Sequence, residues 1–301
     1  MKRQKILVIV GPTASGKTAL GIELAKKFAG EIISADSRQV YRGLDIGTGK
    51  VTKREMRGVP HYLLDIASPK RTVTAHEFAT KARRAIRTIA ASGSLPIIVG
   101  GTGFYIDTLL GRISLPDVPP NPAFRKRLQK KTAAHLYALL KKKDPRRAKS
   151  MDTPSERNNK VRLIRALEIA VAGKPRAELP KAEFDVLWIG ISPKESALEE
   201  RIMRRLKARM KIGMLAEATR LHKQGLSFKR MEELGLEYRA LARLQQKKID
   251  RKQFDEELFR EIRRYAKRQI VYWKRNTEVH WYDPRQKTKI ASKVASWLKV
   301  S

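Results

Sequence analysis

The chain has 301 residues, with 66 lysines and arginines against 30 aspartates and glutamates, which gives a formal net charge of +36. At about 150 residues per domain, this length predicts one large domain or two modest ones. Hydrophobic residues make up 42% of the chain, which excludes a wholly disordered protein. A charge this high shows that the protein is more than an ordinary metabolic enzyme of near-neutral charge. It favours a polyanionic partner, and nucleic acid more than an anionic membrane.

Cysteine is absent from the chain, which excludes disulfides, thiolate zinc sites and cysteine nucleophiles. This composition fits a reducing cytoplasm. The apolar run at residues 6–10 follows a basic N-terminus but is too short for a signal peptide, and no stretch approaches the length of a membrane span. We therefore expect a soluble, cytoplasmic protein with no membrane partner, and a monomer.

The first third of the chain alternates strand and helix patterns. The continuous apolar run at 6–10 is typical of a buried parallel strand, and further strands are predicted at 31–35 and at the apolar stretch 95–99. A helix is predicted after the first run, ending near residue 28, and a second over 76–92, where apolar residues recur at helical spacing. Strands that alternate with helices indicate a parallel sheet covered by helices.

The pattern changes after residue 115, where four prolines stand within seven residues. Residues 121–181 are helical in pattern and carry 18 lysines and arginines against 5 acidic residues. A further buried strand is predicted at 186–191, helices over 195–276 and a short last strand at 280–282. The predicted fold is α/β: a P-loop-type parallel sheet core (1–118 and 183–301) with a basic helical insertion domain (119–182).

A phosphate-binding motif follows the first strand, since residues 11–18 read GPTASGKT and match G-x-x-x-x-G-K-[ST] between a strand and a helix. Backbone N–H groups and the helix N-terminus would bind a di- or triphosphate. Lys17 would reach the terminal phosphate, and Thr18 would ligate Mg²⁺. The predicted diphosphate-binding residues of this loop are Gly11, Pro12, Thr13, Ala14, Ser15, Gly16, Lys17 and Thr18.

The other predicted strands end in Asp36, in Gly100-Gly101-Thr102 and in Ser192, so that only one of these ends is acidic. A motor ATPase normally has a second acidic residue at a strand end to help hold Mg²⁺. The sequence thus predicts a phosphate-binding protein, and the lack of a second acidic strand end is evidence against a motor ATPase.

Several further motifs occur in a fixed order along the chain. They read SADSRQVY at 34–41, DIGTGK at 45–50, PHYLLD at 60–65, GGTGFY at 100–105, NNKVRLIRALE at 158–168 and AKRQ at 266–269. Together with the phosphate loop, this series resembles the bacterial-type tRNA dimethylallyltransferases over nearly the whole chain. The family often has tryptophan three residues after its Arg-Gln pair, where this chain has Tyr272.

The resemblance implies transfer of a dimethylallyl group from dimethylallyl diphosphate to N6 of the adenosine 3′-adjacent to the anticodon in tRNA. Mg²⁺ is the implied cofactor. A diphosphate leaving group needs the same cradle as nucleotide phosphates. Asp36 is expected to act as the general base for the N6 proton, and Thr102 to hydrogen-bond Asp36 or the bridging oxygen. Arg239 is expected to add a contact to the diphosphate.

The tRNA anticodon stem-loop is the implied partner. Ser37 and Gln39 are expected to contact the edge of a flipped adenine, whereas His61 is expected to be structural, and Asp45 and Asp65 to be cap or turn residues. The predicted tRNA-binding residues are Ser37, Arg38, Gln39, Arg125, Arg162, Arg165, Arg264, Lys267 and Arg268.

Two alternatives remain open at this point. A P-loop kinase for a small metabolite would share the fold and could use Asp36 as its base, but it leaves the large positive charge unexplained. A nucleotide-gated RNA-binding module explains the charge but leaves the Asp36-Ser37 and Gly-Gly-Thr motifs without a role.

Overall fold

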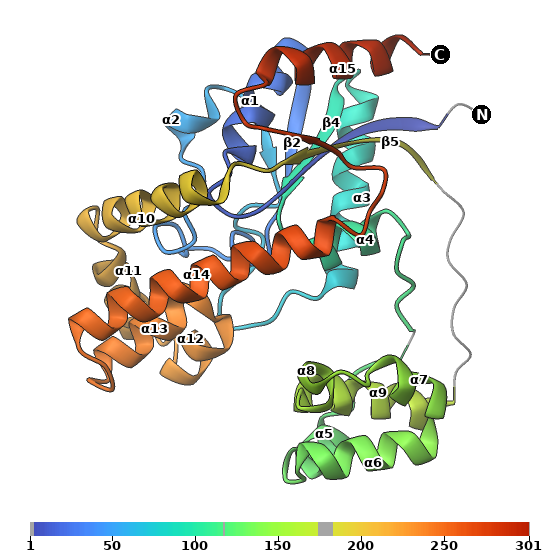
Figure 1. The fold of residues 1–301 in the computed structure, drawn as a ribbon, viewed down its shortest axis with the longest axis vertical. Helices are drawn as coiled ribbons and strands as arrows, with labels where there is room; N and C mark the ends of the chain where they lie inside the picture. The colour runs from blue at the N-terminus through green and yellow to red at the C-terminus, as the bar shows by residue number, and fades with distance from the viewer. Residues whose placement is uncertain (1–2, 117, 174–182, 301) are drawn as a thin grey trace. The chain divides into compact units, whose positions relative to one another are not determined.

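Six parallel strands form one sheet in the larger of two compact units (Figure 1). The computed structural model describes residues 3–116, 118–173 and 183–300. The strand order is β3-β2-β4-β1-β5-β6, which confirms the predicted parallel sheet. The strands are β1 (Gln4–Val10), β2 (Gly30–Ala35), β3 (His61–Tyr62), β4 (Leu95–Gly100), β5 (Phe184–Ile191) and β6 (His280–Tyr282).

The central strands are apolar on both faces because helices cover the sheet from both sides. Residues 6–10 of β1 are fully buried, and β1 lies between β4 and β5, with Leu7 in register with both Ile97 and Leu187. A strand buried on both faces reads as a mostly apolar run, which is why β1, β4 and β5 were predictable, and β2 contributes the apolar Ile32 and Ile33. The two-residue β3 carries no such run and was not predicted.

Helices α1 and α15 pack on one face of the sheet, where Leu20, Ile22 and Ile290 join one apolar core with strand residues. On the other face, α3 contacts β2 and β4, and Trp273 of α14 packs on Trp188 of β5 with ring centroids 5.6 Å apart. The helices of this part are α1 (Lys17–Lys27), α2 (Lys53–Met56), α3 (Ala75–Ala91), α4 (Gly103–Leu109), α10 (Glu195–Lys211), α11 (Met214–Lys223), α12 (Phe228–Leu234), α13 (Leu236–Gln245), α14 (Arg251–Trp273) and α15 (Lys287–Lys299). In the described ranges, none of the helices has the length and apolar character that a membrane span requires.

A second compact unit, residues 113–180, separates the two parts of the sheet unit along the chain. Its helices lie within the predicted insertion, and their starts follow local chemistry: Asn121 and Thr132 cap α5 and α6 with their side chains. Residues 174–182, which include the predicted boundary at 182, lie outside the described residues. The helices of this unit are α5 (Pro122–Gln129), α6 (Ala133–Lys143), α7 (Pro145–Ser150), α8 (Pro154–Arg157) and α9 (Lys160–Ala172).

Candidate active site

The phosphate-binding loop wraps between the end of β1 and the start of α1. Its tight turn needs positive φ angles at Ala14 (61°) and Gly16 (96°), while a Cβ at Gly11 would stand 2.4 Å from the carbonyl oxygen of Ile191. The N–H of Leu20 makes the first helical bond, to Gly16 O at 3.1 Å, so the preceding N–H groups at the start of α1 remain available to an anion. The loop therefore has a geometry that can accept an anion.

A cavity of about 590 Å³ adjoins this loop. The elements that surround it are α1, the ends of β2 and β4, the segment after residue 47, α10 and α14. Its lining residues are Thr13, Ala14, Ser15, Gly16, Lys17, Thr18, Ala19, Ile22, Glu23, Ile32, Ser34, Asp36, Gln39, Thr48, Gly49, Val51, Glu55, Arg57, His61, Val99, Gly100, Gly101, Arg201, Arg204, Arg205, Tyr265 and Gln269. The carboxyl ends of parallel strands thus open on one cavity, as is general for such sheets.

Lys17 is the basic residue of the loop, and its Nζ donates a hydrogen bond to Pro12 O at 2.5 Å. Burial lowers the pKa of Lys17 from its ordinary value to about 7; the nearby Asp36 carboxylate opposes this shift and Arg205 adds to it. The ammonium is therefore poised to gain stability when an anion enters the cavity.

Asp36 follows β2 and lines the same cavity as the phosphate loop. Its Oδ1 accepts hydrogen bonds from the N–H groups of Arg38 (2.8 Å) and Gln39 (3.3 Å). These bonds fix the carboxylate in a turn. Among the described residues, Oδ2 has no hydrogen-bond partner, so it is free to accept a proton.

Thr102 lies at the end of β4, next to Asp36 in the sheet order. Its Oγ1 accepts the N–H of Ser37 at 3.0 Å, and its own N–H donates to Ala35 O at 3.2 Å. The expected bond from Thr102 to Asp36 is absent from the described residues, because the hydroxyl oxygen faces the neighbouring amide. Thr102 thus holds the backbone beside Asp36, and it is not among the residues that line this cavity.

A second cavity, of about 240 Å³, adjoins the first. Thr13, Asp36, Thr48 and Tyr265 line both, so Asp36 faces the two spaces at once. Burial raises the pKa of Tyr265, which keeps its hydroxyl neutral. The residues that line only the second cavity are Ser37, Arg38, Leu234, Gly235, Leu236, Glu237, Arg239, Glu261, Ile262 and Arg268.

Arg239, predicted to contact the diphosphate, lines this second cavity and not the one beside the phosphate loop. Its Nη1 lies 3.6 Å from Glu261 Oε1. Three arginines of α10 line the first cavity instead: Arg201, Arg204 and Arg205. Arg201 also donates to Ser15 O at 3.2 Å. These three arginines were not predicted from the sequence, although their i, i+3, i+4 spacing places them on one helix face.

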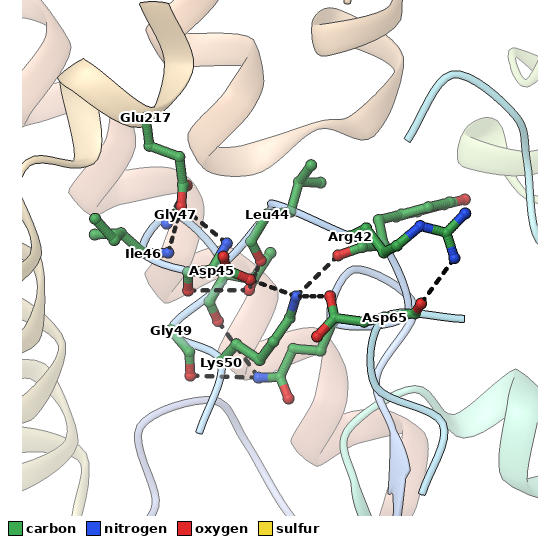
Figure 2. A network of polar contacts seen from close by, with 12 residues as sticks. Arg42, Leu44, Asp45, Ile46, Gly47, Gly49, Lys50, Asp65 and Glu217 are labelled. Atoms are coloured by element: carbon green, nitrogen blue, oxygen red, sulfur yellow. Dashed lines mark hydrogen bonds and ion pairs between the residues drawn. The ribbon is translucent and has the colours of Figure 1, made fainter. Parts of the chain in front are cut away.

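One wall of the first cavity is a loop, residues 42–50, held by buried charges (Figure 2). Glu217 of α11 is 3% exposed, and its carboxylate accepts the N–H groups of Asp45 (2.9 Å), Ile46 (2.7 Å) and Gly47 (2.9 Å). It also accepts the hydroxyl of Tyr238 at 2.7 Å. This loop carries Thr48 and Gly49 into the cavity wall, so Glu217 determines where that wall stands.

Lys50 closes the same loop, since its Nζ donates to Asp45 Oδ1 (2.6 Å), Asp65 Oδ1 (2.5 Å) and Tyr41 O (2.9 Å). Asp45 and Asp65 are thus the turn residues expected from the sequence, here joined through one buried ammonium (Figure 2). His61 is half-buried, and its Nδ1 lies 2.9 Å from Val59 O, consistent with a structural role.

Replacing Glu217 by glutamine is expected to lower the free energy of unfolding by about 1–3 kcal/mol, because one amide N–H would then face an NH₂ group instead of a carboxylate oxygen. Urea unfolding of the variant measures this change. Glu200→Gln, at an exposed position on α10, serves as the matched control and is expected to have no effect. Equal stability of the Glu217 variant and the wild type would contradict a stabilising role for the buried Glu217 carboxylate.

The predicted tRNA-binding residues of the insertion are engaged in ion pairs. Arg125 and Arg165 both bind the buried carboxylate of Glu168, at 2.7 and 3.1 Å, and these bonds help lower the pKa of Glu168 to about 2 against the effect of burial. Arg162 pairs with Glu156. Arg125 and Arg165 therefore stabilise the helix packing of this unit, whatever else they contact.

The predicted tRNA-binding residues of the sheet unit form two groups: those that follow β2 are half-buried, and those on α14 are exposed. Gln39 turns its amide Nε2 toward Thr48 O (3.5 Å) and Gly49 O (3.4 Å), which leaves its Oε1 as the acceptor near Ser34. On α14, Arg264, Lys267 and Arg268 are exposed. Of these three, Arg268 lines the second cavity, where its guanidinium lies 5.8 Å from the Tyr265 ring centroid.

Comparison with known proteins shows the family of the chain. Residues 39–276 match the family model described as IPP transferase. The chain belongs to the IPP transferase family. It is 41% identical to the tRNA dimethylallyltransferase of Shouchella clausii (strain KSM-K16), over 99% of this chain and 98% of that protein. It is also 41% identical to tRNA dimethylallyltransferase 1 of Geotalea uraniireducens (strain Rf4), over 92% of each.

Solved structures of the IPP transferase family share the fold. The full-length tRNA isopentenylpyrophosphate transferase from Bacillus halodurans superposes with a TM-score of 0.74 at 33% identity, covering 99% of this chain and 97% of that one. A eukaryotic dimethylallyltransferase, described as acting on tRNA, gives a TM-score of 0.79 at 26% identity and covers 98% of this chain and 76% of that one. The resemblance seen in the sequence is thereby confirmed, and the chain is a prenyl transferase.

Proposed function

We propose that this IPP transferase moves the dimethylallyl group of dimethylallyl diphosphate to N6 of the adenosine 3′-adjacent to the anticodon of a tRNA. The observation that carries the proposal is the position of Asp36, which lines both the cavity beside the phosphate loop and the adjoining second cavity. One carboxylate then faces the leaving group on one side and the nucleophile on the other.

The diphosphate occupies the first cavity in this proposal. Backbone N–H groups at the start of α1, Lys17 and the α10 arginines Arg201, Arg204 and Arg205 surround it. These groups are fixed before the reaction, and they offset the negative charge that builds on the diphosphate as the C–O bond breaks. Several cations around one anion also explain why the cavity contains more positive than negative side chains.

Asp36 performs the proton transfer. The N6 lone pair of adenine attacks C1 of the dimethylallyl group, the bond from C1 to the diphosphate oxygen breaks, and the N6 proton passes to the Asp36 carboxylate. Because the lone pair is delocalised into the ring, adenine N6 is a poor nucleophile, and loss of its proton must accompany bond formation. Thr102 lines neither cavity, and in this proposal it supports the step by holding the Ser37 N–H beside Asp36.

The adenine enters through the second cavity in this proposal. Arg38, Arg239 and Arg268 line it, and Tyr265 offers an aromatic face between the two spaces. A base that leaves its stack costs a few kcal/mol, which contacts of this kind offset. The exposed Arg264 and Lys267 of α14, and the basic insertion, are proposed to bind tRNA phosphates. The eukaryotic relative described as acting on tRNA supports this partner.

Mg²⁺ fits the donor set of the first cavity. Mg²⁺ prefers oxygen ligands and keeps several waters, and it binds through one or two protein ligands plus substrate phosphates. In the described part of the chain, no group of three or more His, Cys, Asp or Glu side chains gathers as a metal site. Thr18 would therefore hold the ion through its hydroxyl, together with diphosphate oxygens, and the ion would neutralise charge on the leaving group.

Incubation with labelled dimethylallyl diphosphate, Mg²⁺ and unmodified tRNA tests the proposal. Label is expected in the RNA without ATP, on the adenosine 3′ to the anticodon, and a tRNA with guanosine at that position serves as the control. Phosphorylation of a small metabolite with ATP would indicate a kinase instead. Binding of tRNA without transfer would indicate an RNA-binding module. We further propose that the enzyme acts as a monomer in the cytoplasm.

A further inference from the structure

Two glycines of the motif at 100–105 are explained by close packing and not by backbone conformation. A Cβ at Gly101 would stand 2.0 Å from Gln269 Nε2, and a Cβ at Gly103 would stand 2.0 Å from the ring of Tyr272. Neither glycine has a positive φ angle. The turn that carries Thr102 is therefore pressed directly against α14.

Gln269 is the residue of α14 at the centre of this contact. Its side chain is 6% exposed, in the part of the helix that faces the cavity. Its Oε1 accepts the N–H of Thr13, in the phosphate loop, at 2.7 Å, and its Nε2 donates to Gly101 O at 3.1 Å. One buried amide thus connects the loop after β1 with the turn after β4.

The two bonds use both functions of the amide in a fixed sense. Gly101 O can only accept and the Thr13 N–H can only donate, so neither a carboxylate nor a hydrocarbon side chain satisfies both partners. Since the Thr13 N–H is occupied by Gln269, it is not among the amides that face a diphosphate. The backbone of Thr13 is instead held by the side chain of Gln269 on α14.

From this geometry we infer that Gln269 is a positioning residue: it sets the distance between the diphosphate cradle and the turn that carries Thr102. The expected effect on the reaction rests on the proposed function. The hydrogen-bonded link between the phosphate loop and the Gly101 turn does not depend on it. The diphosphate on one side, and Asp36 beside the backbone that Thr102 holds on the other, must stand within a fraction of an ångström of their productive positions. Gln269 is a buried group that bonds both loops.

The consequence for substitution is specific. Gln269→Met keeps the length of the side chain and removes both hydrogen bonds, so the phosphate loop and the Gly101 turn can shift independently. Gly101→Ala leaves Gln269 in place but forces its amide away from the turn. Trp273→Phe is the matched control, because Trp273 is buried on the same face of α14 and packs on Trp188, and its indole Nε1 has no hydrogen-bond partner among the described residues.

The test combines kinetics with two measurements that do not need catalysis. For Gln269→Met we expect kcat/KM for dimethylallyl diphosphate to fall by about 10- to 100-fold, with both a lower kcat and a higher KM, as small misplacements of reacting groups produce. Calorimetric binding of inorganic diphosphate is expected to weaken, whereas the Kd for tRNA stays near the wild-type value. Trp273→Phe is expected to lower only the Tm.

A kcat/KM for Gln269→Met equal to that of Trp273→Phe would overturn the inference, as would unchanged binding of inorganic diphosphate. If Gln269→Met fails to fold, Gly101→Ala carries the same kinetic expectation and the same contrary outcome. Because diphosphate binding is measured without tRNA, failure of this inference is distinguishable from failure of the proposed function, which would appear as absence of transfer by the wild-type enzyme.

Discussion

Replacing Asp36 by asparagine is expected to lower kcat for dimethylallyl transfer by about 10²- to 10⁴-fold, the usual contribution of a general base. The asparagine Oδ1 still accepts the N–H groups of Arg38 and Gln39, so the turn after β2 is preserved. Only the capacity to take the N6 proton is lost. Steady-state transfer assays measure the effect, and the affinity for tRNA is expected to remain nearly unchanged.

Asp36→Ala should lose the same activity and, in addition, some stability, because the two N–H groups then lack their acceptor. Asp45→Asn is the matched control: this carboxylate pairs with Lys50 outside the cavity lining, and its loss should leave kcat unaltered. Weakened tRNA binding with normal turnover in Asp36→Asn would mean that Asp36 positions RNA and is not the base.

Lys17→Met is expected to lower kcat/KM for dimethylallyl diphosphate by about 10²- to 10³-fold, since one preorganised charge on the leaving group is removed. The wild-type enzyme should also show a pH dependence. The pKa of Lys17 in the free protein is about 7, so the ammonium is present below this pH and is lost as the pH rises through it. Because kcat/KM reports on the free enzyme, it should decline above about pH 7.

Bound diphosphate favours the ammonium form and raises the pKa of Lys17, so kcat should decline less than kcat/KM over the same range. Lys17→Arg keeps its charge at every accessible pH and should remove the decline that begins near neutrality. Lys26→Met, at an exposed position of the same helix, is the control. A wild-type kcat/KM that stays level from about pH 6 to about pH 9 would exclude a neutral Lys17 in the free enzyme.

The local features of the site could be predicted because each is recorded in consecutive residues. The phosphate loop needs glycines and a lysine at fixed spacing between a strand and a helix, and the apolar runs of β1, β4 and β5 follow from burial on both faces. Asp36 and Thr102 stand directly after strands of a parallel sheet, so the topology alone brings them to the same edge.

The arginines of α10 and the clamp of Glu217 were not predicted. Arg201 and its neighbours have the spacing of one helix face, but on a chain with 66 basic residues such a face is unremarkable until its target is known. Glu217 is separated from the loop that it holds by about the length of a whole domain in the sequence. No periodic pattern predicts a pairing over such a separation.

The amino-acid sequence by itself determined the class of this protein: an ordered set of short motifs for a parallel sheet, a phosphate cradle and a carboxylate at a strand end, together with a charge suited to RNA. Tertiary structure alone decided which groups share the cavity and what holds them there. Thr13 and Gln269 are 256 residues apart and form one hydrogen bond. Contacts of this kind depend on how helices pack on the sheet, and packing is a property of the whole chain, which local sequence patterns do not record.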